Sequence, residues 1–188
     1  MAALVVTATA CSSGRGTGPG AFPAVTAGTD VFVPGSVAAA DVGYVDGVAQ
    51  NFEDGGRLVA RLAASAARCV AERWVAIVDP AILRAAGLAP EAMVDVTLER
   101  LAEVTTLDRP RAEALAGSFT VCGVDHTAAF LDSLLLTSQI TPTQRVCLAE
   151  AIPAGLIGAI TVSVLVDAAL DPALSTQYQK ALDACPPT

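Results

Sequence analysis

Residues 57–78 read RLVARLAASAARCVAERWVAIV, and their apolar side chains recur every three or four positions. That period is typical of a helix that buries one face. The apolar stripe carries Leu58, Leu62, Ala66, Cys69, Val70 and Ile77, and a second stripe carries Arg57, Arg61, Arg68 and Glu72. We expect Asn51 to cap this helix, with Asp54 at the fourth place. The segment therefore predicts a long helix whose cysteine points into a core.

Signals for helix starts recur along the rest of the chain. They are Asp79-Pro80, Pro90-Glu91, Asp108 with Pro110, Asp125, the pair Thr141 and Gln144, and Asp171-Pro172. Capping residues and a proline in the first turn are typical of helix N-termini. The first of these helices should end near Gly87, and residues 90–107 should form one helix through Val94, Leu98 and Leu101.

Residues 151–166, AIPAGLIGAITVSVLV, carry no charge. A membrane-spanning helix needs about 20 apolar residues, and proline and glycine interrupt this shorter run. We expect a buried core helix, with a strand over residues 159–166 as the alternative because of their β-branched side chains. The whole pattern predicts an all-α fold, a compact bundle of roughly six to eight short helices.

Length and composition favour one domain with a core of small and aliphatic side chains. The chain has 188 residues, of which 53% are hydrophobic and only 4% aromatic. Its net charge is −8, which argues against nucleic acid and anionic lipid surfaces as charge-driven partners. We expect a helical domain over residues 52–188, preceded by an extended, Gly- and Pro-containing arm over residues 29–51.

The N-terminal region contains a short apolar run followed by Ala8-Thr9-Ala10-Cys11. This tetrapeptide resembles the lipobox of bacterial lipoproteins, in which the cysteine becomes the lipid-bearing first residue. The resemblance implies a signal-peptide remnant at residues 1–10, a lipid on Cys11 and attachment to the outer face of the cell membrane. Residues 11–28 would be a flexible tether. The alternatives are ordinary secretory cleavage after Ala10, or a disordered start.

Four cysteines remain when Cys11 is set aside: Cys69, Cys122, Cys147 and Cys185. An even set in an exported protein indicates disulfides, whereas in a cytosolic protein it indicates buried thiols. Three pairings are open. Cys-x-Ala-Glu occurs at Cys69 and again at Cys147, which suggests two related halves, residues 52–123 and 124–188. We therefore favour the pairs Cys69–Cys122 and Cys147–Cys185.

An export signal followed by Cys-x-Ala-Glu helices and a final helix ending in cysteine resembles secreted or lipid-anchored helical proteins of high-GC bacteria. The resemblance covers about residues 55 to 185 and rests on spacing. It implies no particular activity.

Candidate reactive groups are few. His126 lies one or two helical turns from Asp132 and Ser133, but a hydrolase needs a nucleophile on a strained turn, and no G-x-S-x-G is present. We expect a partly solvated histidine in a first helical turn. A single histidine and no CxxC leave little for a metal site, so no metal and no cofactor are expected.

Three other features have a structural and a functional interpretation. Asp95, Glu99 and Glu103 form an acidic row, which we expect to be a solvated face because one straight helix face cannot surround Ca²⁺. Trp74 could anchor a partner, but a core position is favoured. The alternate glycines of residues 14–20 lack the Gly-Lys-Ser/Thr of a phosphate loop and are assigned to the tether.

The sequence leads to two candidate functions. The first is a non-enzymatic cell-envelope lipoprotein that presents a disulfide-stapled helical domain to an envelope protein partner. The alternative is a carrier of a small apolar ligand or lipid in a cavity between helices. A closed core favours the first, and an apolar cavity of several hundred Å³ favours the second.

Overall fold

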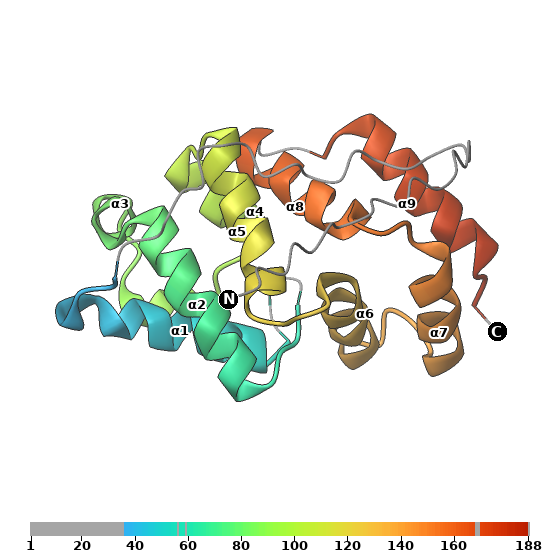
Figure 1. Ribbon diagram of the computed structural model, residues 1–188, viewed down its shortest axis with the longest axis horizontal. Coiled ribbons are helices and arrows are strands. Elements are labelled where there is room, and N and C mark those ends of the chain that lie inside the picture. Colours follow the sequence, from blue (N-terminus) through green and yellow to red (C-terminus); the bar gives the residue numbers. More distant parts are fainter. Residues whose placement is uncertain (1–35, 56, 59, 168–169, 188) are drawn as a thin grey trace, which may run out of the picture.

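The structure of the protein is a computed structural model that describes residues 36–187 apart from positions 56, 59, 168 and 169. Every regular element of these residues is helical (Figure 1). The elements are η1 (Ala39–Asp41), α1 (Val42–Glu53), α2 (Ala64–Val78), α3 (Pro80–Ala85), η2 (Pro90–Val94), α4 (Leu98–Thr105), α5 (Arg109–Val121), α6 (His126–Leu136), α7 (Pro142–Ala151), α8 (Leu156–Asp167) and α9 (Pro172–Ala184). The predicted all-α fold is confirmed. Cys11, the lipobox-like tetrapeptide, the expected tether and residues 29–35 of the expected arm lie outside the described residues.

The predicted caps account for most helix starts. The carboxylates of Asp79, Asp108, Asp125 and Asp171 each accept a backbone N–H two or three residues on, at 2.7–3.0 Å. Thr141 and Gln144 form a full capping box at the start of α7. These bonds satisfy N–H groups that have no partner inside the helix. The sequence signals therefore placed these starts correctly.

The region around Asn51 differs from its prediction. Helix α1 occupies residues that we expected in an extended arm, and Asn51 lies fully buried in its last turn instead of capping a helix. Its side-chain amide donates to the carbonyls of Met93 and Val96 at 2.9 and 3.0 Å, and its Oδ1 accepts the N–H of Leu58 at 3.3 Å. A capping residue must stand at a helix start, whereas this one joins α1 to two other segments.

The expected long helix begins only at Ala64. The chain turns at Gly55, which has φ +65 and whose added Cβ would lie 2.7 Å from Cδ2 of Leu136. Leu58 and Leu62 are buried, but from an irregular segment in which Arg61 N–H bonds to the carbonyl of Ala129. Their apolar spacing therefore reflects burial in an irregular segment and does not indicate a helix.

The expected single helix over residues 90–107 is also divided. The 3-10 helix η2 ends at Val94, and Thr97 then caps α4 by accepting the N–H of Arg100 at 3.1 Å. Asn51 provides the physical reason. Its amide binds the carbonyls of Met93 and Val96, which would otherwise be acceptors in a continuous helix.

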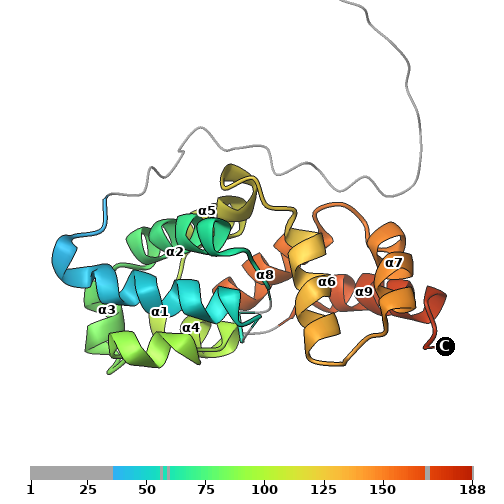
Figure 2. The ribbon, with the colours of Figure 1, turned by 90° about the horizontal axis from the view of Figure 1, so that it is seen from below.

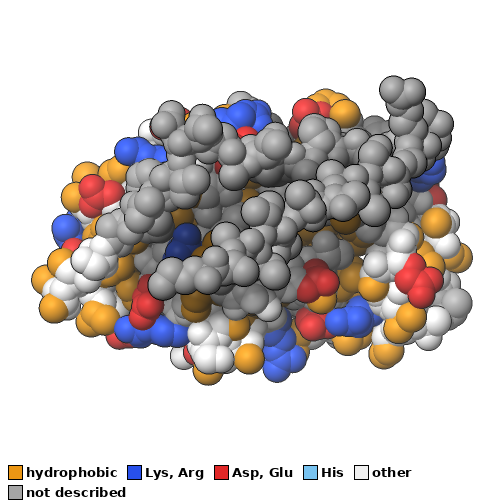
Figure 3. Space-filling model, in the orientation of Figure 1, with side chains coloured by type: hydrophobic (Ala, Val, Ile, Leu, Met, Phe, Trp, Pro, Cys, Tyr) orange, Lys and Arg blue, Asp and Glu red, His pale blue; other side chains and the backbone are white. Residues whose placement is uncertain are grey.

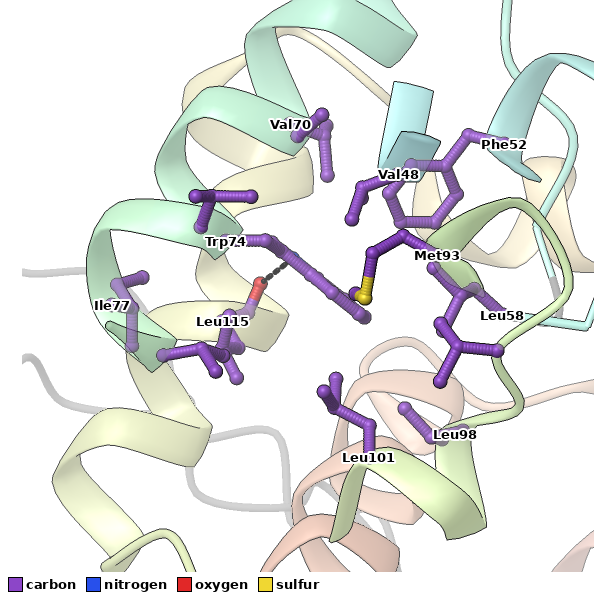
Figure 4. Close-up of a cluster of buried hydrophobic side chains, with 14 of the residues drawn as sticks. Val48, Phe52, Leu58, Val70, Trp74, Ile77, Met93, Leu98, Leu101 and Leu115 are labelled. Carbon is purple, nitrogen blue, oxygen red and sulfur yellow. Dashed lines mark hydrogen bonds between the residues drawn. The ribbon is translucent and has the colours of Figure 1, made fainter. Parts of the chain in front are cut away.

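Two hydrophobic cores lie at the two ends of the helical array. Helices α1 to α5 gather at one end, α6, α7 and α9 gather at the other, and α8 lies between them (Figures 1 and 2). The first core surrounds Trp74, whose indole donates to the carbonyl of Leu115 at 3.0 Å (Figure 4). Trp74 is only 2% exposed, so the predicted core position is confirmed.

Helix α8 contributes to both cores. Leu156 and Ile157 at its start belong to the second, and Val162 and Leu165 further along belong to the first. Residues 156–167 are thus the expected core helix, and the alternative strand is not formed. The division between halves at residues 123 and 124 does not separate the cores, because α8 crosses from one to the other.

Both favoured disulfides are present. Cys69 pairs with Cys122 and Cys147 pairs with Cys185, with Cα atoms 5.9 and 5.8 Å apart. The first joins α2 to the end of α5, and the second joins α7 to the end of α9. Two intact disulfides are consistent with an oxidising, extracytoplasmic location.

In the described part of the chain, no single helix is long and apolar enough to cross a membrane. Two consecutive pairs, α5 with α6 and α7 with α8, pass the length and composition test together but are bent by 86° and 87°. Buried core helices of soluble proteins pass the same test.

Candidate functional site

A cleft of about 730 Å³ opens between α5, α8 and the first turn of α6. Helix α5 lines it with Ala116 and Gly117, and α8 lines it with Gly158, Ala159 and Val162. The C-terminal end of α7 and the start of α9 complete the walls. The site therefore lies where the two cores meet, and small side chains leave the space between the facing helices open.

The cleft changes in polarity from its floor to its mouth. Ile152, Val162 and Ser163 are the buried residues of its lining, and the Ser163 hydroxyl accepts the backbone N–H of Asp171 at 2.9 Å. The charged lining residues Arg109, Asp125 and Asp171 are exposed, and Glu113 is half-buried. Exposed groups stand nearest solvent, so the mouth carries the charges, and the floor is uncharged and mainly apolar. A molecule that fills the cleft would place an apolar part inward and a polar part outward.

His126 lies between these two zones and is half-buried. Its ring stacks on Phe119, with centroids 3.8 Å apart and planes 8° from parallel. Burial lowers the pKa of His126 from 6.5 to about 4, and the nearby Asp125 carboxylate opposes this only in part. The imidazole is therefore neutral at pH 7, with one nitrogen that can donate and one that can accept.

The histidine continues an aromatic cluster of the first core. Phe52, Trp74 and Phe119 meet edge to face, with centroids 5.2–6.0 Å apart. Across from Phe119, a Cβ added at Gly158 would lie 4.0 Å from Nδ1 of His126. Neither ring nitrogen hydrogen-bonds to another residue of the described chain. Both remain available to a molecule in the cleft.

Two helix-interior glycines border the cleft from opposite sides. A Cβ at Gly117 would meet no described atom within 4 Å, and a Cβ at Gly158 would meet only His126. Glycine inside a helix costs about 0.5–1 kcal/mol relative to alanine. Packing does not require a glycine at either position, because a Cβ would fit. These glycines therefore keep space open in the cleft and lower the stability of their helices.

The residues considered for a hydrolase are not brought together as a catalytic group. Ser133 is buried and donates to the carbonyl of Gly55 at 3.2 Å. Asp132 pairs with Arg145 at 2.6 Å. Each has a structural partner on another element, while His126 faces the cleft.

The acidic row is solvated as expected. Asp95, Glu99 and Glu103 are all exposed, and Glu103 pairs with Arg100 at 3.1 Å. Asp95 precedes α4, so the three do not share one helix. The described residues contain no group of three or more His, Cys, Asp or Glu side chains that could hold a metal ion. On the face in Figure 3, charged side chains of both signs are interspersed over the described residues.

The sequence suggested a cavity between helices as the alternative, but it did not predict where the cleft lies, although His126 was singled out. The available signal was a pair of glycines inside apolar helical segments, Gly117 and Gly158, without a turn to explain them. No protein-family model, curated protein or solved structure matches the chain. The function is therefore argued from the geometry of the site.

Proposed function

We propose that the protein is an extracytoplasmic binding protein that holds a small, mainly apolar ligand in the cleft between α5 and α8. The cleft of about 730 Å³ carries this proposal, since ligand sites commonly have volumes of about 300–1,000 Å³ and mainly apolar walls. The open cavity favours the carrier role over the protein-interaction role that came first from the sequence.

The two disulfides support a preformed site. One fixes α2 to α5 on one side of the cleft, and the other fixes α7 to α9 on the other side. Walls that are held before binding lose little conformational freedom on binding, which favours affinity. A stapled frame around an open cleft suits a carrier that meets its ligand outside the cytoplasm.

The protein-interaction role has less support. The large hydrophobic side chains that are exposed among the described residues lie on separate elements. They are Val42, Val121, Leu136, Val146 and Leu170. A stable interface usually needs a contiguous apolar patch.

A fluorescence titration tests the binding function. N-phenyl-1-naphthylamine, an apolar dye that brightens in apolar sites, is added to the oxidised full chain, and then to Ala159→Phe, which fills the cleft from α8. Ala85→Phe on the exposed face of α3 is the matched control. We expect saturable binding by the native protein and by the control, and at least tenfold weaker binding by Ala159→Phe. Absent binding, or equal binding by all three proteins, would contradict the proposal.

We further propose that Cys11 carries a lipid that anchors the protein at the outer face of the cell membrane. The lipobox-like Ala8-Thr9-Ala10-Cys11 and the two disulfides support this location. Intact mass before and after reduction and alkylation tests it. Added acyl mass on a chain beginning at Cys11, with four thiols released only by reduction, is expected. An unprocessed chain with free thiols would overturn it.

A further inference from the structure

We infer that the ligand of the cleft is an apolar molecule with a cationic amine at one end, its apolar part on the floor and its amine at the mouth beside Glu113, Asp125 and Asp171. This inference rests on the proposed binding function and specifies its ligand class. It is argued from the charges of the residues that line the cleft and from the hydrogen bonds that they can form.

The charge of the lining favours a cation. Three carboxylates, Glu113, Asp125 and Asp171, face one guanidinium, Arg109, and His126 is neutral at pH 7. The carboxylates also come from three different elements, α5 and the starts of α6 and α9, so the cleft is lined with negative charge from three elements. An ammonium group there gains attraction from several directions, whereas the carboxylate of a fatty acid meets like charge.

The neutral histidine adds a hydrogen-bonding group to the lining that carries these carboxylates. His126 is held flat by its stack on Phe119, and its nitrogens have no hydrogen-bond partner among the described residues. An unprotonated ring nitrogen accepts a hydrogen bond from an ammonium N–H. A protonated histidine would offer donors only, and its positive charge would repel the amine.

The polarity gradient fixes the orientation of the ligand. The buried Ile152 and Val162 have no polar side-chain group, and the hydroxyl of the buried Ser163 already accepts the N–H of Asp171. The floor therefore offers no charge to compensate a desolvated ammonium, and the amine stays at the mouth. The exposed carboxylates remain in contact with water and leave the ammonium partly hydrated. The apolar part of the ligand then displaces water from the floor, which supplies the main driving force.

Three ligands of equal chain length separate these contributions. Decylamine, decanol and decanoate are titrated below their critical micelle concentrations into the oxidised full chain at pH 7.5 and low salt, with dye displacement as the measurement. A primary amine is cationic at this pH, as a lysine side chain is. We expect decylamine to bind about tenfold tighter than decanoate, with decanol between them, and the difference to shrink as salt is added.

Variants that remove charge but keep shape locate the effect. Asn remains a good helix cap, so the triple variant Glu113→Gln, Asp125→Asn and Asp171→Asn should fold. The control triple variant Asp95→Asn, Glu99→Gln and Glu103→Gln removes the same charge from exposed positions that do not line the cleft. The cleft variant should lose the preference for decylamine and retain decanol affinity, and the control should retain both.

The outcomes distinguish the ligand class from the binding function. If decanoate binds as tightly as decylamine, or if both triple variants reduce the preference equally, the amine assignment is wrong. The binding function would then still stand where Ala159→Phe weakens decanol binding. If the dye binds but none of the three ligands displaces it, the amine assignment is wrong and the binding function stands on the dye titration; if the dye does not bind either, both inferences fail.

Discussion

One disulfide packs at the edge of each hydrophobic core and is built in the same way in both, but the side chains that fill the two cores differ. In both, a cysteine inside a helix, Cys69 in α2 or Cys147 in α7, bonds to a cysteine that ends a later helix, Cys122 or Cys185. The first core is large and centred on three aromatic rings. The second is small and made mainly of leucine and isoleucine.

The difference shows what each disulfide has to do. The first core buries Trp74, Phe52 and Phe119 together, and aromatic side chains contribute the largest apolar areas. The second core has a partly buried aromatic pair at its edge, Phe130 and Tyr178, and takes part of its volume from α8. We therefore expect the first disulfide to reinforce a core that burial already stabilises, and the second core to depend more strongly on its disulfide.

Removing a disulfide should have the largest effect, and the two disulfides should differ in which helices open. For Cys147→Ala with Cys185→Ala, the loop of sequence separation 38 implies a loss of about 4 kcal/mol, and the separation of 53 for the first disulfide implies nearly the same. The location of the damage should differ. Hydrogen exchange should show α7 and α9 opening independently in this variant, with α1 and α2 still protected.

The matched control is Cys69→Ala with Cys122→Ala. Here we expect lower global stability but no separate opening of α2 and α5, because the aromatic cluster still holds them. If both double variants unfold in a single cooperative step by all probes, the two cores form one cooperative unit. The expected difference between the two disulfides is then wrong.

The junction of the cores should be sensitive to acid through His126. Its pKa is about 4 in the folded protein and 6.5 when unperturbed, so between these values the unfolded chain binds more protons. The free energy of unfolding should therefore fall as the pH falls from about 6.5 to about 4, by up to about 3 kcal/mol. Above pH 6.5 this contribution is fully present.

Urea unfolding of the native protein and of His126→Gln at a series of pH values measures how the free energy of unfolding depends on pH. Carboxylates titrate in the lower part of the same range, but they remain in both proteins, and the difference between the two curves isolates the histidine. Parallel curves would mean that His126 is as solvated in the fold as in the unfolded chain.

Buried amide side chains offer a smaller comparison of the cores. Asn51→Ala leaves the carbonyls of Met93 and Val96 and the N–H of Leu58 without partners in the first core, at a cost of about 2–3 kcal/mol. In the second core, Gln144 donates to the carbonyl of Cys185 at 3.1 Å but is only partly buried. Gln144→Ala should cost about 1 kcal/mol, since water can replace the bond. Chemical denaturation of both variants measures the two losses in the free energy of unfolding and so tests their ratio.

Local signals predicted the fold better than they predicted its interruptions. Asp108, Asp125 and Thr141 act within a few residues, so their caps were readable from the sequence. The break after α1 follows the turn at Gly55, whereas the break at residues 95–97 depends on Asn51, whose partners Met93 and Val96 lie 42 and 45 positions away. A contact at that separation overrides the apolar period, and no single-sequence signal reports it.

The site shows the same limit. The sequence predicted the pairing of Cys69 with Cys122 and a histidine in the first turn of α6. It did not predict that Phe119 would stack on His126, because that contact depends on the turn between α5 and α6. It suggested a cavity between helices as an alternative but could not locate it, because a cleft is a volume left between helices whose packing distance depends on many side chains.

Glycine to alanine substitutions should change the free energy of unfolding least. The sign of that change should differ between the cleft and the first core. In α1, a Cβ at Gly47 would lie 2.6 Å from the carbonyl oxygen of Pro90 and 2.8 Å from Cβ of Met93. Gly47→Ala should therefore destabilise by about 1–3 kcal/mol through overpacking. At Gly117 and Gly158 the added methyl group has room.

Gly117→Ala and Gly158→Ala should each raise the free energy of unfolding by about 0.5–1 kcal/mol, because alanine favours the helix and no contact is strained. Thermal unfolding of the three single variants provides the measurement. A stabilising change at both cleft positions would mean that the chain forgoes helix stability to keep this space open, as a binding site requires. If either cleft variant is instead destabilised like Gly47→Ala, the facing helices pack against that glycine, and the cleft is narrower than its lining indicates.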